Sequence, residues 1–140
     1  MNYLPFPAAQ VHLPRDGGYF LNLADLRPAK VVLFFYPRDN TSSCTIEAKT
    51  FTSFLSQFEA LNTRVIGISK DNIKSHDKFV SKHNLKIPLL SDENNNVCES
   101  FNVWKEKSMY GRKYMGIERS TFIINPDGKL IKEWRGVKVP

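Results

Sequence analysis

The stretch Val31–Cys44, VVLFFYPRDNTSSC, decides the fold of this chain. Its first six residues, Val31 to Tyr36, are aliphatic or aromatic, which predicts a buried strand. Pro37 cannot donate a hydrogen bond to a sheet, so we expect the strand to end there. A polar loop follows, and Cys44 stands where a helical pattern begins, carried by Phe51, Phe54, Leu55, Phe58 and Leu61. The stretch therefore predicts a strand, a loop and a helix, with a cysteine at the start of the helix.

The position of Cys44 favours a reactive thiol. In the first turn of a helix, a sulfur lies near unpaired backbone N–H groups and the positive end of the helix dipole. Both favour the thiolate, which is the nucleophilic form. The alternative is an inert cysteine, since free cysteines are among the most buried residues. Thr41, Ser42 and Ser43 place hydroxyls beside the sulfur and no apolar cover, which favours the reactive interpretation.

The rest of the chain predicts an α/β fold. After the helix over residues 44–61, a second buried strand is expected at Thr63–Ser69, so the two strands should pair in parallel with a right-handed crossover. Cys44 then lies at the carboxyl end of a strand, where open α/β sheets place their sites. A helix at Ile73–His83 and a hairpin of Ser120–Asn125 with Lys129–Gly136 complete a thioredoxin-like arrangement, with a central mixed sheet flanked by helices.

Shorter segments carry weaker patterns. We expect short strands at Gln10–Leu13 and Tyr19–Leu21, a helical turn after Asn22, an edge strand at Ile87–Leu90, a short helix near Val97–Phe101 and a long polar and aromatic loop at 104–118. The run Ser75-His76-Asp77 resembles a catalytic triad only in composition. Adjacent residues on a helix point in different directions, so we interpret this run as a solvated helix face.

Two stretches resemble a known family. Pro37 to Cys44 is similar to the P-x-x-x-T-x-x-C signature of peroxiredoxins. YPRDNTSSCTIEA, residues 36–48, and VWKEKSMYGRKYMGIERSTFIINPDG, residues 103–128, resemble the subfamily called bacterioferritin comigratory protein or peroxiredoxin Q. The resemblance runs from about Leu13 to Pro140. It implies one thioredoxin-like peroxiredoxin domain over residues 1–140, without the C-terminal helix that this subfamily usually carries.

The resemblance implies a thiol-dependent peroxidase, which reduces hydrogen peroxide and organic hydroperoxides through a sulfenic acid at Cys44. It also implies three roles in the site. The Thr41 hydroxyl bridges sulfur and peroxide, Arg119 stabilises the thiolate and the leaving oxygen, and Pro37 shields the pocket from water. Glu47 lies one turn after Cys44, where it either orients an arginine or is a plain first-turn acid favoured by the helix dipole.

The chain departs from the subfamily at the resolving cysteine. Many members carry it five residues after the reactive one, where this chain has Lys49, and the second family location, near Phe79-Val80, also lacks a cysteine. Cys98 is either an atypical resolver or a small packed residue, and its apolar neighbours favour packing. We therefore expect a one-cysteine mechanism with thioredoxin, glutaredoxin or a small thiol as reductant.

Other classes of cysteine protein fit less well. A disulfide oxidoreductase needs C-x-x-C, whereas residues 44–47 read Cys-Thr-Ile-Glu. A phosphatase loop needs an arginine soon after the cysteine, and a cysteine protease needs a paired histidine that nothing in the sequence positions. A non-catalytic peroxide or redox sensor stays open as the alternative, because it uses the same thiolate but reacts once.

Composition limits the partners. The chain has 140 residues, enough for one domain, and its two cysteines and three histidines do not make a disulfide scaffold or a zinc site. The net charge of +6 is spread along the chain without a nucleic-acid-binding motif. The sequence also shows no secretory signal and no apolar run of transmembrane length. We expect a cytoplasmic monomer that uses no cofactor or metal and binds neither nucleic acid nor membranes.

Overall fold

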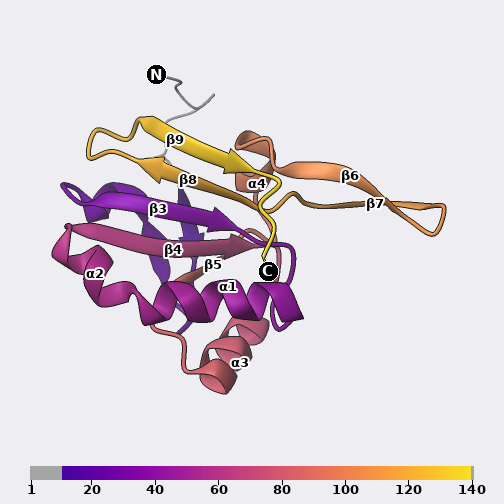
Figure 1. Ribbon diagram of the computed structural model, residues 1–140, viewed down its shortest axis with the longest axis horizontal. Helices are drawn as coiled ribbons and strands as arrows, with labels where there is room; N and C mark the ends of the chain where they lie inside the picture. Colours follow the sequence, from indigo (N-terminus) through magenta and orange to yellow (C-terminus); the bar gives the residue numbers. More distant parts are fainter. Residues whose placement is uncertain (1–10, 140) are drawn as a thin grey trace.

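The computed structural model describes residues 11–139, and its centre is a five-stranded sheet in the order β5-β4-β3-β8-β9 (Figure 1). Strand β3 pairs in parallel with β4 and antiparallel with β8. These strands span Lys30–Phe35 (β3), Thr63–Ser69 (β4), Leu89–Ser91 (β5), Ser120–Ile124 (β8) and Leu130–Arg135 (β9). The predicted mixed sheet, with one parallel and one antiparallel half, is confirmed.

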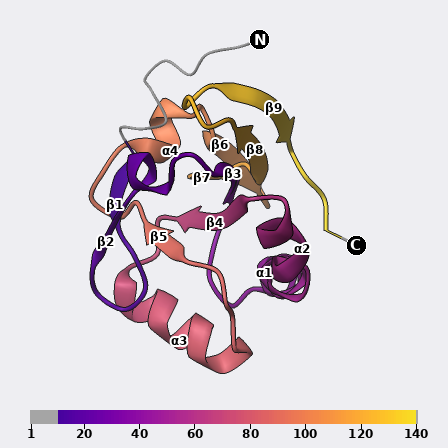
Figure 2. The same cartoon turned by 90° about the vertical axis from the view of Figure 1, so that its left-hand side faces the viewer.

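Strand β3 divides the molecule into two cores because its side chains alternate between the faces of the sheet. Leu33 and Phe35 join one apolar cluster, whereas Phe34 and Tyr36 join the other. Helices α1 (Ser42–Ser53), α2 (Leu55–Ala60) and α3 (Ile73–His83) cover the Phe34 face. Figure 2 shows the ribbon of β1 (His12–Pro14) and β2 (Phe20–Asn22), and α4 (Val97–Ser100), on the other side. Phe34 stacks on Phe51 of α1 at 4.7 Å between ring centroids, which fixes α1 against the sheet.

The helix after the loop that carries Pro37 to Thr41, here called the cysteine loop, differs from its prediction at its start and in its interior. Helix α1 spans Ser42–Ser53, so it begins two residues before Cys44. The expected single helix is interrupted at Phe54, whose φ of −101° and ψ of 8° lie outside the helical range, and α2 continues over Leu55–Ala60. The earlier start places Cys44 at the third position of α1, still within the first turn.

The remaining helices and short strands follow the sequence patterns closely. Helix α3 spans Ile73–His83, and the Asn22 side chain caps the 3-10 turn Leu23–Leu26 by accepting a bond from the Ala24 N–H. The other short elements are β1 (His12–Pro14), β2 (Phe20–Asn22) and α4 (Val97–Ser100). Strand β5 is an edge strand, as expected, but it spans Leu89–Ser91 and begins after Pro88 rather than at Ile87. The expected start at Gln10 lies outside the described residues.

The loop predicted for residues 104–118 is wrong. Strands β6 (Trp104–Met109) and β7 (Arg112–Ile117) pair antiparallel and extend away from the body of the molecule (Figure 1). Tyr110 and Gly111 connect them, both with positive φ, as a tight hairpin turn requires. The two strands are exposed over most of their length, so they lack the apolar alternation by which half-buried strands are recognised.

Across residues 11–139, no helix is both long enough and apolar enough to span a membrane.

Candidate active site

Cys44 lies where the carboxyl end of β3 and the start of α1 meet. Thr41 is the N-cap residue of α1, and its hydroxyl donates a hydrogen bond to the carbonyl of Arg38 at 3.1 Å. Only 1% of Cys44 is exposed, and it packs into the apolar cluster on the α1 side of the sheet. The expectation that no apolar cover lies over the sulfur is therefore wrong. The helix start buries the cysteine beneath the loop rather than presenting it to solvent.

Arg119 reaches Cys44 from the neighbouring strand. The register of β3 and β8 pairs Phe35 with Ser120, which places Arg119 beside the end of β3 although it is 75 residues away in sequence. Its Nη2 donates to the Cys44 Sγ at 3.2 Å, and its Nη1 donates to the Glu47 Oε1 at 2.7 Å. One guanidinium fork therefore joins the sulfur to a carboxylate one turn further along α1.

Burial and neighbouring charge shift the pKa values of Glu47 and Arg119 in opposite directions. Burial raises the pKa of Glu47, and the charge and hydrogen bonds of Arg119 only partly offset it. For Arg119, burial lowers the pKa, but Cys44 and Glu47 outweigh burial and raise it overall. The guanidinium therefore stays charged beside the sulfur, where it stabilises negative charge.

Lys107 brings a second cation to the edge of the site. Its Nζ donates to the carbonyl of Ile117 at 2.6 Å, just before Arg119. Burial lowers the pKa of Lys107, the Arg119 charge lowers it further, and the charges of Cys44 and Glu118 oppose both. The sequence showed Lys107 only as one of several positive residues in its segment, because the hairpin that carries it was not predicted.

The structure separates the other predicted site residues from this cluster to different degrees. Pro37 lies two residues after the end of β3 and is half-buried, whereas Thr41 is exposed. Cys98 is 0% exposed on α4 and belongs to the opposite apolar cluster, so the sheet lies between its side chain and Cys44. Both cysteines are free thiols. The structure therefore groups Cys44, Arg119 and Glu47, and places Cys98 on the other side of the sheet.

An apolar groove of about 630 Å³ lies beside Glu47. It runs between α1 and the β8–β9 hairpin, and its walls include Ile46, Phe51, Ile123 and Trp134. Glu47 is the member of the site in its wall, and an apolar surface of this kind suits an alkyl group.

The prediction of a solvated face for Ser75-His76-Asp77 is wrong for His76. Its side chain is fully buried and bonds Asp39 of the cysteine loop, which sequence reasoning did not single out. Asp77 is exposed, as expected. The missed signal is helical periodicity, because His76, Phe79, Val80 and His83 recur on one stripe of α3.

The family model for AhpC/TSA proteins matches residues 6–133 of the chain. The Peroxiredoxin Bcp of Bacillus subtilis strain 168 is 46% identical over 132 residues, which cover 94% of this chain and 84% of the relative. The Peroxiredoxin Bcp of Xanthomonas campestris pv. campestris is 41% identical over 138 residues, which cover 97% and 86% of the two chains.

Solved structures agree with the sequence relatives. A cysteine-to-serine mutant of Xylella fastidiosa PrxQ matches with a TM-score of 0.92 and 41% identity, covering 99% of this chain and 86% of that one. A Xanthomonas campestris Peroxiredoxin Q mutant matches with a TM-score of 0.90 and 40% identity, covering 97% and 87%. The thioredoxin-like fold is thereby confirmed, and the chain belongs to the AhpC/TSA family as a peroxiredoxin of the Bcp and peroxiredoxin Q type.

Proposed function

We propose that Cys44 is the peroxidatic residue of this thiol peroxidase and that it reduces hydrogen peroxide and organic hydroperoxides in a one-cysteine cycle. The observation that carries the proposal is the 3.2 Å contact between the Arg119 Nη2 and the Cys44 Sγ. Arg119 is itself held by Glu47 at 2.7 Å, so the donor is fixed before substrate arrives.

In the first step, the Cys44 thiolate attacks the terminal oxygen of the peroxide. The S–O bond forms as the O–O bond breaks, so the sulfur is oxidised to a sulfenic acid and the second oxygen leaves as hydroxide or alkoxide. That anion takes a proton and departs as water or an alcohol. Arg119 stabilises the thiolate and the leaving oxygen, with a guanidinium contribution of at most about 4 kcal/mol near 4 Å at an effective dielectric of 20, before desolvation.

Two further residues complete the proposed site. The Thr41 hydroxyl bridges sulfur and peroxide after exchanging its bond to the Arg38 carbonyl for one to substrate. Pro37 shields the sulfur side of the pocket, consistent with its half-buried place at the end of β3. The apolar groove beside Glu47 supports organic hydroperoxides as substrates, because it offers an alkyl group a surface next to the carboxylate that holds Arg119.

An external thiol resolves the sulfenic acid in this proposal. A reductant thiol condenses with the sulfenic acid, which releases water and forms a mixed disulfide, and a second thiol then returns Cys44 to the thiolate. The reductant is thioredoxin, glutaredoxin or a small thiol, and the enzyme works as a cytoplasmic monomer. The place of Cys98 in the cluster across the sheet supports an external resolver, because a disulfide needs Cα atoms within about 7 Å.

The test is intact mass after one equivalent of hydrogen peroxide, on the parent, Cys44→Ser and Cys98→Ser, with dimedone added to tag sulfenic acid. The tag is needed because Met109 and Met115 are exposed and also take up oxygen. We expect one dimedone adduct in the parent and Cys98→Ser, and none in Cys44→Ser.

Other outcomes identify the competing functions. A loss of two hydrogens that either substitution abolishes would make Cys98 the resolver. An adduct on Cys44 without sustained consumption of peroxide in the presence of reduced thioredoxin, glutaredoxin or dithiothreitol would indicate a sensor that reacts once. An unmodified parent would overturn the peroxidatic role of Cys44.

A further inference from the structure

Asp39 is a buried residue in an otherwise exposed loop. Its neighbours Arg38 and Asn40 are exposed, whereas the Asp39 side chain is 3% exposed. Its Oδ1 accepts a bond from the Tyr36 hydroxyl at 2.6 Å, and its Oδ2 accepts from the Ser75 hydroxyl at 2.8 Å. Burying a carboxylate costs free energy, and these hydrogen bonds offset that cost. The bonded Asp39 therefore fixes the loop between Pro37 and Cys44 at one point.

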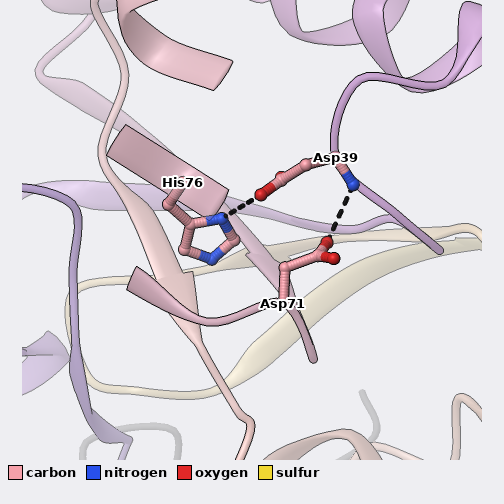
Figure 3. A group of neighbouring side chains, drawn as sticks. All are labelled: Asp39, Asp71 and His76. Carbon is pink, nitrogen blue, oxygen red and sulfur yellow. Dashed lines mark hydrogen bonds and ion pairs between the residues drawn. The ribbon is translucent and has the colours of Figure 1, made fainter. Parts of the chain in front are cut away.

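His76 links that aspartate to the far edge of the sheet. Its Nδ1 lies 2.7 Å from the Asp39 Oδ2, and its Nε2 lies 2.9 Å from the carbonyl oxygen of Leu90 in β5. Asp71 adds a further attachment, because its Oδ2 accepts the backbone N–H of Asp39 at 2.8 Å (Figure 3). The cysteine loop is therefore fastened to α3, to β5 and to the segment after β4.

The bonding pattern favours a His76 ring that is protonated on both nitrogens. A carbonyl oxygen only accepts, so Nε2 is a donor, and an ionised Asp39 carboxylate accepts from a protonated Nδ1. Burial lowers the pKa of His76, but the hydrogen bond and charge of Asp39 outweigh it, with help from the Leu90 carbonyl and Asp71, and the pKa is raised overall. Tyr36 also faces the ring, at 6.5 Å between centroids.

The side chains of Asp39, Asp71 and His76 form a cluster in which each is hydrogen-bonded to its surroundings. Their candidate ligand atoms lie within 4.8 Å of one another, close enough for a cation. However, Asp39 and His76 share a hydrogen bond, and Asp71 accepts from both the Asp39 N–H and the Ser69 hydroxyl. These hydrogen bonds explain the cluster without a cation, because they hold the cysteine loop in place.

We propose that His76 is a positioning residue that clamps Asp39 to β5 and thereby keeps the first turn of α1 aligned so that Cys44 faces Arg119. This inference rests on the proposed function of Cys44. Asp39 lies five residues before Cys44 and two before Thr41, so a shift of the loop moves both groups that the peroxide must meet. Misplacing a reacting group by about 1 Å can lower a rate about a hundredfold.

The test compares two reactions of Cys44 in the full chain. Peroxide reduction requires aligned donors, whereas alkylation by iodoacetamide requires only an accessible thiolate. Single-turnover rates with hydrogen peroxide and iodoacetamide are measured for the parent, His76→Gln and Asp39→Ala, well below each melting temperature. We expect the peroxide rate to fall about tenfold to a hundredfold, and the alkylation rate to change less than about threefold.

Two matched variants on α3 serve as controls. Lys74→Gln changes an exposed residue of the same helix, and Asp77→Ala removes an exposed acid that bonds the Gly17 N–H. Both should keep the ratio of the two rates within about twofold of the parent. Asp39→Ala provides a second route to the same answer if His76→Gln fails to fold.

The outcomes separate the two proposals. One outcome is that His76→Gln and Asp39→Ala, the clamp variants, both have a lower melting temperature and yet keep the parent ratio of peroxide to iodoacetamide rates. In that case His76 has a structural role only and the inference is overturned. If the parent itself does not react with peroxide at Cys44, the proposed function fails instead. A fall of the ratio in both clamp variants but in neither control supports the positioning role.

Discussion

The two cysteines of this chain are almost equally buried, yet their surroundings differ in the sign of the nearest charge. Cys44 is 1% exposed and receives a bond from the Arg119 guanidinium. Cys98 is 0% exposed, and its backbone N–H donates to the Asp92 carboxylate at 2.7 Å. Burial first, and then Asp92, raise the pKa of Cys98. Exposure alone therefore does not distinguish the proposed reactive thiol from Cys98, whereas the charge beside each sulfur does.

The largest expected effect is the loss of peroxidase turnover in Cys44→Ser. A serine hydroxyl cannot take the place of a thiolate, so the rate of peroxide consumption with dithiothreitol should fall at least about a thousandfold. The matched change Cys98→Ser should leave it within about threefold. Equal losses in both variants would contradict the difference between the two sites.

Alkylation of the folded protein should show the second largest contrast. Both sulfurs are buried, but burial and Asp92 raise the pKa of Cys98 and keep its sulfur protonated. A thiolate that costs about 3 kcal/mol more to form reacts about a hundredfold more slowly. Peptide mass spectrometry over time should therefore find Cys44 labelled at least about a hundredfold faster than Cys98. Labelling in denaturant is the control, because the two rates should converge when the fold is lost.

Replacing the guanidinium fork should have a smaller effect. Arg119→Lys keeps a positive charge but cannot bond Cys44 and Glu47 at once, so we expect a tenfold to hundredfold lower second-order rate with peroxide, roughly the loss of one oriented charged donor. Arg135→Lys, on β9, is the matched control and should react at the parent rate. A parent-like rate in Arg119→Lys would show that charge without geometry is sufficient.

The smallest effect concerns stability at Glu47. Because burial raises its pKa in the folded state, the stabilising contribution of protonated Glu47 is present below the ordinary pKa of 4.5 and is lost as pH rises through the folded value. Glu47→Gln should therefore be as stable as the parent in acid and more stable at pH 7, by up to about 1 kcal/mol.

Urea unfolding at several pH values measures this difference, with the exposed Glu59→Gln as control. At the same time, the peroxide rate of Glu47→Gln should fall about threefold to tenfold, since an amide holds Arg119 less firmly than a carboxylate. A variant that is less stable than the parent at pH 7 would show that the ionised pair with Arg119 stabilises the fold overall.

The parts of the molecule that the sequence predicted well are those with a buried periodic pattern. Strand β4 and helix α3 were expected within their observed limits, because apolar residues recur along them with the periods of strand and helix. Hairpin β6–β7 was missed because neither of its faces is continuously buried. Its turn at Tyr110-Gly111 was the available signal.

In the site, residues that depend on local sequence were easier to predict than residues that depend on contacts distant in sequence. Cys44 was singled out from its place at the end of a strand, but Arg119 came from the resemblance alone, because nothing local indicates which residue 75 positions away will meet a sulfur. The burial of His76 was not predicted, because the comparison of Ser75, His76 and Asp77 left out the helical spacing that places His76 on the buried stripe of α3. The bond to Asp39 depends on tertiary packing, which periodicity does not specify.

The central place of β3 also determines when the reactive centre can be assembled during synthesis. Arg119 meets Cys44 only after β8 has paired with β3, and 75 residues separate the two. At 5–20 residues per second, a ribosome needs roughly 4 to 15 s to bridge that gap. Until then the nascent chain carries Cys44 without Arg119, so the proposed peroxide chemistry would be acquired with the last hairpin rather than with the first βαβ unit.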